Sequence, residues 1–348
     1  MSLSPESLGC PVPRAEGERV LLAHGEGGRL TRRLIRELLL PRLDNDALRP
    51  LADGAVVAAP AGRMVLTTDS YVVSPLFFPG GDIGKLAVHG TVNDLAVCGA
   101  RPRYLSLGLI VEEGLPLDTL RRVLESLGEA ARACGVYVVT GDTKVVPRGA
   151  ADGLFLNTAG VGELRADVDL AATRVRPGDQ VLVSGTVGDH GIAILSAREG
   201  LGLGEEVRSD TAPLDGMVHA LLDEVGVRFL RDATRGGVAA VLHELSDAAG
   251  VSVILDEAAV PVSEPVRGAC ELLGLDPLYV ANEGKLVAVV APEDAGRALA
   301  CLRAHPLGRA AVIGEVRPRD RTPVQVRGLL GSLRALDEPS GAPLPRIC

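Results

Sequence analysis

Strand-like and helical patterns alternate along almost the whole chain, and this alternation restricts the fold more than any other feature of the sequence. Short runs rich in Val and Leu, such as Met64–Thr68 and Tyr104–Val111, favour strands. Asp82–Cys98 and Leu117–Cys134 have the residue spacing of helices, and a glycine follows each of them, as is common at helix C-termini. The pattern predicts an α/β fold of the α+β type, in which helices cover one side of a sheet.

The remaining elements follow the same alternation. Arg29–Leu40 is predicted to form an amphipathic helix that Pro41 ends, and Ala55–Ala58 a short strand. We expect further strands at Val136–Thr140, Leu154–Ala159, Gln180–Ser184, Val251–Leu255, Lys285–Val290 and Ala311–Val316, and further helices at Gly191–Arg198, Pro213–Val225, Thr234–Ala249, Val266–Leu273 and Glu293–Ala304.

An Arg-Pro-Gly-Asp turn at Arg176–Asp179 lies in a break between two units of the chain. The 348 residues are enough for two domains of about 150 residues each. We expect an N-terminal extension and helix over residues 1–50, an N-terminal domain over 51–166 and a C-terminal domain over 167–326. The last segment, residues 327–348, is rich in glycine and proline and is predicted to be a flexible tail.

Composition excludes several classes of protein. A net charge of −9 and an aromatic content of 2% leave neither a basic face nor stacking platforms for nucleic acid. No apolar run approaches the roughly 20 residues that span a bilayer, and Met1–Gly9 lacks the pattern of a signal peptide. None of the six cysteines belongs to a Cys-x-x-Cys pair. The sequence predicts a cytoplasmic protein that binds neither nucleic acid nor membrane and has reduced thiols.

Six aspartates lie in glycine-rich or turn-like contexts. Any single one is explained by helix capping or turn formation. As a set they favour a Mg²⁺ site, because convergent carboxylates repel one another unless a cation joins them. Mg²⁺ then bridges the carboxylates to the phosphates of a substrate. The six residues are Asp53, Asp69, Asp82, Asp94, Asp142 and Asp232.

Two further patterns leave alternatives open. The glycine-rich segment Phe77–Lys85 precedes a predicted helix, but the chain has no Walker A motif. Its backbone amides are able to approach a phosphate, and a plain tight turn explains the glycines equally well. Lys144 follows a turn and Glu283 precedes a strand, so they form either an acid/base pair or a surface ion pair.

The chain ends in a cysteine, Cys348, on the tail rich in glycine and proline. We expect its thiol to be exposed and mobile, with a pKa near or above about 8.5, because the terminal carboxylate is a like charge. A flexible tail of this length spans roughly 25 Å, enough to carry the thiol into and out of a site on its own or a neighbouring subunit. An inert terminal residue is the alternative.

Four motifs and the end of the chain resemble one known family. The motifs are FFPGGDIGKLAVHGTVNDLAVCGA at Phe77–Ala100, TGDTKVV at Thr140–Val146, RDATRGG at Arg231–Gly237 and VANEGK at Val280–Lys285, and the chain ends in Pro-Arg-Ile-Cys. Together they resemble the HypE family, the carbamoyl dehydratases of hydrogenase maturation. That family belongs to the superfamily of aminoimidazole ribonucleotide synthetase, selenophosphate synthetase and thiamine-monophosphate kinase. The resemblance spans roughly residues 18 to 348.

The resemblance implies a two-domain fold like that of aminoimidazole ribonucleotide synthetase, in which the N-terminal sheet forms a homodimer. It implies that a HypF-like carbamoyltransferase loads a carbamoyl group on Cys348. ATP then phosphorylates the carbamoyl oxygen, a base removes the amide protons and phosphate leaves, which produces a thiocyanate. The cyano group passes to iron on a HypC–HypD-like scaffold complex, for the nickel–iron site of a hydrogenase.

The resemblance also implies roles for individual residues. It places Lys144 and Glu283 beside the modified Cys348, with the choice of base between the two left open. It implies Mg²⁺ ligands at Asp53, Asp94 and Asp232. It implies nucleotide contacts at Asp69, Asp82, Lys85, Asn93, Asp142 and Thr143.

Four features depart from the family pattern. Ala52 precedes Asp53 where the superfamily often has a second aspartate, His89 replaces a small residue, and Thr211 stands where the family often has cysteine. Residues 327–331 lack an expected threonine. None of these departures falls on Cys348, Lys144 or Glu283.

Two other functions are compatible with parts of the sequence. A small-molecule kinase or synthetase of the same superfamily would not need Cys348, and the cysteine-terminated tail argues against it. A carrier that presents a thiol without using ATP would tolerate the loss of Asp94 and Asp232. The set of acidic motifs argues against that carrier.

Overall fold

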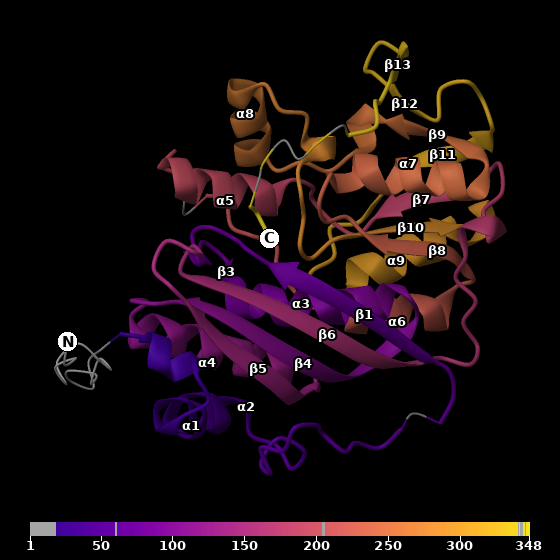
Figure 1. Ribbon diagram of the computed structural model, residues 1–348. Coiled ribbons are helices and arrows are strands. Elements are labelled where there is room, and N and C mark those ends of the chain that lie inside the picture. Colours follow the sequence, from indigo (N-terminus) through magenta and orange to yellow (C-terminus); the bar gives the residue numbers. More distant parts are fainter. Residues whose placement is uncertain (1–18, 60, 204–205, 340, 342–343, 345) are drawn as a thin grey trace, which may run out of the picture.

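The computed structural model describes residues 19–59, 61–203, 206–339, 341, 344 and 346–348. Most of the expected N-terminal extension, residues 1–18, lies outside this range, as does part of the expected tail. Two sheets lie one above the other in Figure 1, the lower one formed by residues 64–164 and the upper one by residues 180–335. The expectation of an α+β fold with two units is confirmed.

The N-terminal sheet has four strands and one helix-covered face. Strands β4 and β5 run parallel, and the other neighbours run antiparallel. Helices α3 (Ile83–Val97) and α4 (Leu117–Ala133) pack on one face. On the opposite face, the side chains of Met64, Leu66 and Ile110 are exposed. In spatial order the strands are β1 (Met64–Tyr71), β6 (Leu154–Leu164), β4 (Ala100–Glu112) and β5 (Tyr137–Val146).

The C-terminal sheet has seven strands, and helices lie beside it (Figure 1). In spatial order the strands are β13 (Leu333–Ala335), β12 (Val324–Arg327), β9 (Val251–Asp256), β11 (Ala311–Pro318), β7 (Gln180–Val183), β10 (Leu286–Val290) and β8 (Val227–Asp232). The helices of this unit are α5 (Asp189–Glu199), α6 (Asp215–Glu224), α7 (Gly237–Ala249), α8 (Glu264–Leu273) and α9 (Ala295–Ala304).

Helix α3 joins the two units. Nearly all its side chains are buried, because it packs on the N-terminal sheet and on α4 and also contacts α6 and β8 of the C-terminal unit. A short hairpin of β2 (Phe77–Phe78) and β3 (Gly81–Asp82) leads into it. The carboxylate of Asp82 caps its N-terminus by accepting the backbone N–H groups of Gly84 and Lys85 at 2.8 and 3.1 Å.

Three local predictions are wrong. Residues 55–58 form no strand, and the sequence analysis missed the short strands β2, β3, β12 and β13. The N-terminal helix does not end at Pro41: α1 (Arg29–Leu34) widens into a π-helical turn (Ile35–Leu39) and continues as α2 (Leu40–Leu43). Proline has no backbone N–H to donate, and it lies just inside the start of α2, where that loss is tolerated.

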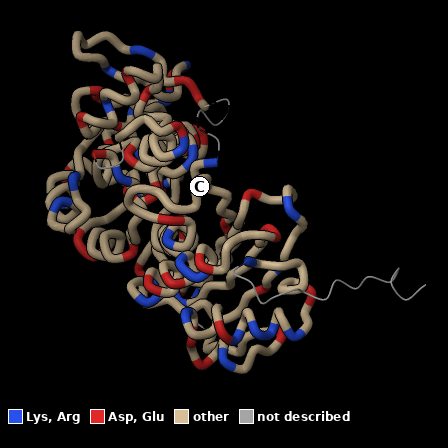
Figure 2. The backbone as a smooth tube through the Cα atoms, turned by 90° about the vertical axis from the view of Figure 1, so that its left-hand side faces the viewer, with Lys and Arg blue, Asp and Glu red and all other residues tan. Residues whose placement is uncertain are grey.

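The first part of the expected tail is attached to the C-terminal sheet. Strand β13 lies within residues 327–348 and pairs with β12, and Arg334 forms ion pairs with Glu257 and Asp276 at 3.2 and 3.1 Å. Figure 2 places the C-terminus in the middle of the molecule, and it shows basic and acidic residues mixed along the backbone. No helix of the described residues is both long and apolar enough to cross a membrane.

Replacing Gly90 by alanine should destabilise the protein. A Cβ atom there would overlap the hydroxyl of Tyr71, which is fully buried and has no room to move. We expect a loss of about 1–3 kcal/mol in the free energy of unfolding, measured by urea denaturation. Gly296→Ala is the matched control, because open space surrounds that position on α9. Equal stability of the two variants would contradict this account of the packing.

Candidate active site

Three carboxylates from different elements converge between the two units. Asp69 lies on β1, Asp94 on α3 and Asp232 at the end of β8. Desolvation and the negative charge of Asp94 raise the pKa of Asp232 to about 7. Desolvation and the charge of Asp69 raise the pKa of Asp94, although the Thr67 hydroxyl donates a hydrogen bond of 2.7 Å to its carboxylate. The three side chains therefore repel one another and favour a cation among them.

Two of the three predicted Mg²⁺ ligands fit such a cation. Among the described residues, no group of three or more acidic, histidine or cysteine side chains is placed to hold a metal ion alone. Mg²⁺ commonly uses one or two carboxylates and completes its shell with water and substrate phosphates, which suits Asp94 and Asp232. Asp53 is exposed, and its neighbours Ala52 and Gly54 line a cavity beside β5 instead.

Glu283 and Cys348 meet at this cluster. Burial, followed by the charges of Asp210 and Asp69, raises the pKa of Glu283 well above its usual value. The thiol of Cys348 lies beside the Glu283 carboxylate, and burial together with that negative charge raises the thiol pKa as well. Arg235 lies in the loop that precedes α7, and its guanidinium is 3.9 Å from the Asp69 carboxylate. Cys348 is therefore half-buried, and the expectation that its thiol is exposed is wrong; its mobility stays a prediction.

A buried ion pair holds Glu283 in place. Lys285 Nζ lies 2.9 Å from Asp210 Oδ2, and the two side chains are 10% and 5% exposed. Burial alone would raise the pKa of Asp210, but the charge of Lys285 and the hydrogen bonds from Lys285 and the Glu283 backbone outweigh it, and the pKa is lowered. Asp210 also accepts the backbone N–H of Glu283 at 2.9 Å. The sequence analysis missed Asp210, Lys285 and Arg235; the last two lie inside motifs that it quoted, but Asp210 carries no such signal.

Asp82 and Asn93 serve the fold rather than an open site. Besides capping α3, Asp82 accepts a hydrogen bond from Ser126 at 2.5 Å. Asn93 is buried, and its amide donates to the carbonyls of Ala212 and Glu283, both at 3.1 Å. Its amide oxygen accepts the backbone N–H of Leu214 at 2.7 Å. Their polar groups are bonded within the protein in this structure, and their nucleotide contacts stay predictions.

The two predicted lysines, Lys85 and Lys144, lie on different elements and have different neighbours. Lys85 is on α3, and burial followed by its positive charge lowers the pKa of His89 to about 4. Lys144 is on β5, where it pairs with the exposed Asp142 at 3.8 Å. Since β5 and β1 are opposite edges of a four-stranded sheet, three strand spacings, roughly 14 Å, separate their backbones. One chain does not bring Lys144 beside Glu283.

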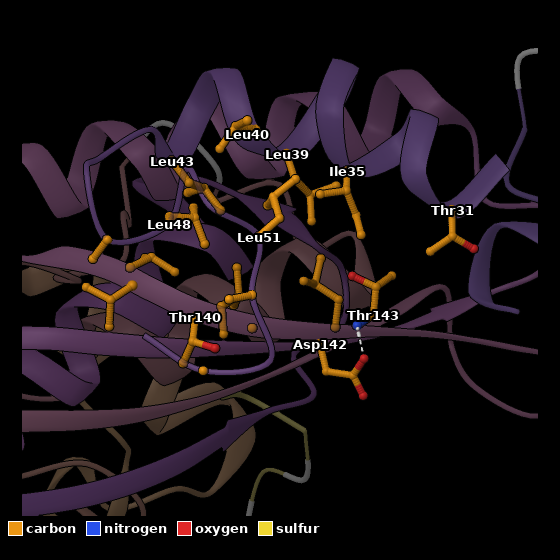
Figure 3. A pocket seen from close by; sticks show the side chains of 18 residues that line it. Thr31, Ile35, Leu39, Leu40, Leu43, Leu48, Leu51, Thr140, Asp142 and Thr143 are labelled. Carbon is orange, nitrogen blue, oxygen red and sulfur yellow. Dashed lines mark hydrogen bonds between the residues drawn. The ribbon is translucent and has the colours of Figure 1, made fainter. Parts of the chain in front are cut away.

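A cavity of about 170 Å³ lies between the N-terminal helices and strand β5 (Figure 3). Ile35, Leu39 and Leu43 point toward it from above, so its walls are mostly apolar. Asp142 and Thr143, two of the predicted nucleotide contacts, line its other side. The Asp142 carboxylate accepts the backbone N–H of Thr143 at 2.9 Å.

The chain matches two models of AIR synthase related proteins. The N-terminal domain model covers residues 51–164, and the C-terminal domain model covers residues 176–327. The fold and the convergent site therefore define an AIR synthase related protein.

Within that class, the similarity points to one family. The carbamoyl dehydratase HypE of Cupriavidus necator is 55% identical over 333 residues, which cover 95% of each chain. A crystal structure of the hydrogenase maturation protein HypE in complex with ATP has a TM-score of 0.91 and 50% identity, covering 94% of this chain and 99% of that one. A chain of a HypE–HypF complex has a TM-score of 0.76 and 45% identity, with coverages of 88% and 99%. The chain belongs to the HypE family of carbamoyl dehydratases.

The raised pKa of Asp232 gives a pH-dependent prediction. Between its ordinary value of 3.8 and its folded value of about 7, the folded state binds a proton that the unfolded state has released. The free energy of unfolding should therefore fall as the pH rises through this window, by up to about 1.4 kcal/mol per pH unit for one group. Asp232→Asn should lack this contribution. Urea denaturation at several pH values with EDTA measures the difference, and parallel profiles for the two proteins would contradict it.

Proposed function

We propose that this protein uses ATP to dehydrate a carbamoyl group on Cys348 to a thiocyanate, which supplies cyanide to the iron of a nickel–iron hydrogenase. The position of the half-buried Cys348 thiol beside the Glu283 carboxylate and the convergent aspartates carries this proposal. The relatives named carbamoyl dehydratase and the related structure in complex with ATP support it. The reaction converts a thiocarbamate and ATP into a thiocyanate, ADP and inorganic phosphate.

Glu283 is the proposed base. The carbamoyl oxygen attacks the γ-phosphorus of ATP, which turns an oxide into a phosphate leaving group. The carbamoyl nitrogen loses one of its two protons to water as the oxygen is phosphorylated, and Glu283 takes the second as the C–O bond breaks and the C≡N bond forms. Its raised pKa makes it a stronger base than an ordinary carboxylate, and it acts only after losing its own proton. We therefore expect the rate to rise with pH above the usual range of glutamate.

Charge neutralisation is the second requirement. Asp94 and Asp232 would hold Mg²⁺, whose charge neutralises the phosphates of ATP. The guanidinium of Arg235 supplies a second positive charge, close to Asp69 and Cys348. The apolar cavity beside β5 suits the adenine ring, with Asp142 and Thr143 at its polar side.

We propose that the working enzyme is a homodimer whose sites are shared between chains. Strands β1 and β5 are the edges of the N-terminal sheet, and no further strand of the described residues pairs with either of them. The uncovered face carries the exposed side chains of Met64, Leu66 and Ile110. Pairing β5 of one copy with β1 of the other would bring Lys144 and the adenine cavity of one chain to Glu283 and Cys348 of the other.

The proposed partners follow from the reaction. A carbamoyltransferase must load the thiol, and the HypE–HypF structure supports a HypF-like protein in that role. An iron-carrying scaffold of the HypC–HypD type would receive the cyano group. The reaction requires both partners to reach the same thiol.

Intact mass tests the reaction. The protein is loaded by its carbamoyltransferase and then incubated with and without Mg-ATP. We expect the loaded protein to lose one water only with ATP, and Cys348→Ala to bind ATP without being loaded. Glu283→Gln should be loaded but should lose water at least about a hundredfold more slowly, the usual loss for a general base. ATP turnover without a mass change at Cys348 would favour a kinase or synthetase that acts on a free small molecule.

Mixing two inactive variants tests the shared site. Lys144→Ala and Glu283→Gln are each expected to be inactive, but a heterodimer of the two contains one site with both native residues. After subunit exchange at equal concentrations, roughly a quarter of the wild-type activity should return, because half the dimers are mixed and each has one intact site of two. Activity that stays at background after demonstrated exchange would place both residues in one chain's site.

A further inference from the structure

The end of the chain is docked as an extra strand-like segment. The backbone N–H of Val72 donates to the Cys348 carbonyl at 3.1 Å, and the N–H of Ser74 donates to the Arg346 carbonyl at 3.3 Å. The pairing is antiparallel and follows directly after β1. The Ile347 side chain is buried in the core that also contains Tyr71. These contacts place the thiol at the carboxylates, as Figure 1 shows by the position of the C-terminus between the two sheets.

Two side chains of α5 hold the backbone of this segment. His190 Nε2 lies 2.6 Å from the Ile347 carbonyl oxygen. Arg198 donates from Nη2 to the Arg346 carbonyl at 2.6 Å, and it also donates to the Ser74 carbonyl at 3.0 and 2.9 Å. Arg198 therefore bridges the docked segment and the strand on which it lies. We call His190 and Arg198 the latch.

The contacts of His190 fix its protonation. It is fully buried, and burial lowers its pKa, so the neutral ring is favoured. A carbonyl oxygen only accepts, so Nε2 carries the proton toward Ile347. Nδ1 then accepts from the Ser209 hydroxyl at 2.8 Å. The edge-on contact with Phe78, at 5.7 Å between ring centroids, fixes the plane of the ring.

Arg346 stores strain in the docked state. Its φ of +55° is a left-handed conformation, which a residue with a side chain adopts at a cost. Its guanidinium pairs with Asp152 at 2.6 Å and donates to the Val72 carbonyl at 3.3 Å. Such a conformation persists only while surrounding contacts hold it. Removing latch contacts should therefore release the segment rather than leave it docked.

We propose that His190 and Arg198 are positioning residues that control whether Cys348 faces Glu283 or is presented outside. The proposal rests on the proposed function, because only a thiol that two enzymes modify in turn needs both positions. A weakened latch then has opposite effects on the two steps. It speeds the loading of Cys348 by another protein and slows dehydration inside the site.

The chain offers matched variants for a test. Arg198→Met removes the donors and keeps the length of the side chain. His190→Gln retains an N–H donor near the position of Nε2, whereas His190→Asn retains polar atoms only near Nδ1. Arg297→Met makes the same chemical change on α9, where the ion pairs are with Glu224 and Asp294, far from the tail.

The first readout is the alkylation rate of Cys348 by iodoacetamide, relative to the exposed Cys98 of the same molecule. Cleavage before aspartate separates the two thiols into peptides 337–348 and 94–117. Arg198→Met and His190→Asn should each raise the relative rate roughly three- to tenfold, the usual effect of losing a hydrogen bond of this kind. His190→Gln and Arg297→Met should stay near the wild-type rate. Unchanged alkylation in Arg198→Met, or equal rates for the two His190 variants, would overturn the latch.

The second readout separates the latch from the proposed reaction. In Arg198→Met, carbamoyl loading should be faster and the loss of water per loaded thiol slower, with ATP affinity and melting temperature unchanged. If carbamoyl loading and the loss of water both became slower, the proposal that the latch controls the position of Cys348 would be overturned. Because alkylation requires neither ATP nor a carbamoyl donor, it tests the latch even if the loaded protein never loses water, a result that would count against the proposed function alone.

Discussion

The mutual repulsion of carboxylates between two sheets is the constraint on which the rest of this structure depends. Asp69, Asp94 and Asp232 lie on β1, α3 and β8, and Glu283 lies in the loop before β10; burial makes their like charges costly. The fold tolerates them because the surrounding groups are rigid: α3 is packed on both sides, and Asn93 holds the carbonyl of Glu283. A site held in this way favours a cation, which the proposed magnesium-bound nucleotide would supply.

The charges of Asp210 and Lys285, in contrast, compensate each other. This ion pair is satisfied within the protein, so it positions Glu283 without entering the chemistry. The Asp210–Lys285 pair is satisfied, whereas the charges of the nearby carboxylate cluster are not. We use this difference to separate groups that support the site from groups proposed to act in it.

Much of the fold could be predicted because hydrophobic periodicity and glycine caps are local signals. The long helices α3 and α4 and most of the strands are close to their predicted bounds. Strands β12 and β13 were missed because they are short and lie beside a glycine-rich turn. Residues 55–58 are apolar but form no strand, since no neighbouring backbone in the chain pairs with them.

The site could be predicted only in part, and for a physical reason. The residue types at Asp94, Asp232, Glu283 and Cys348 were found from the sequence motifs, and the structure brings them together. Asp82 and Asn93 belong to the same motifs, but capping and bridging use the same polar groups as ligand binding, so the sequence alone does not separate the two uses. The distance between Lys144 and Glu283 depends on strand order, which local patterns do not encode.

The raised pKa of the docked Cys348 has a consequence for survival of the enzyme between turnovers. Oxidants such as peroxide attack the thiolate, and the docked thiol stays protonated at neutral pH. A cysteine at the end of a chain would otherwise be among its most easily oxidised groups, and two such chains could become linked by a disulfide. Docking therefore shields the residue on which the proposed reaction depends, and under that proposal oxidation threatens the thiol only while it is presented to another protein.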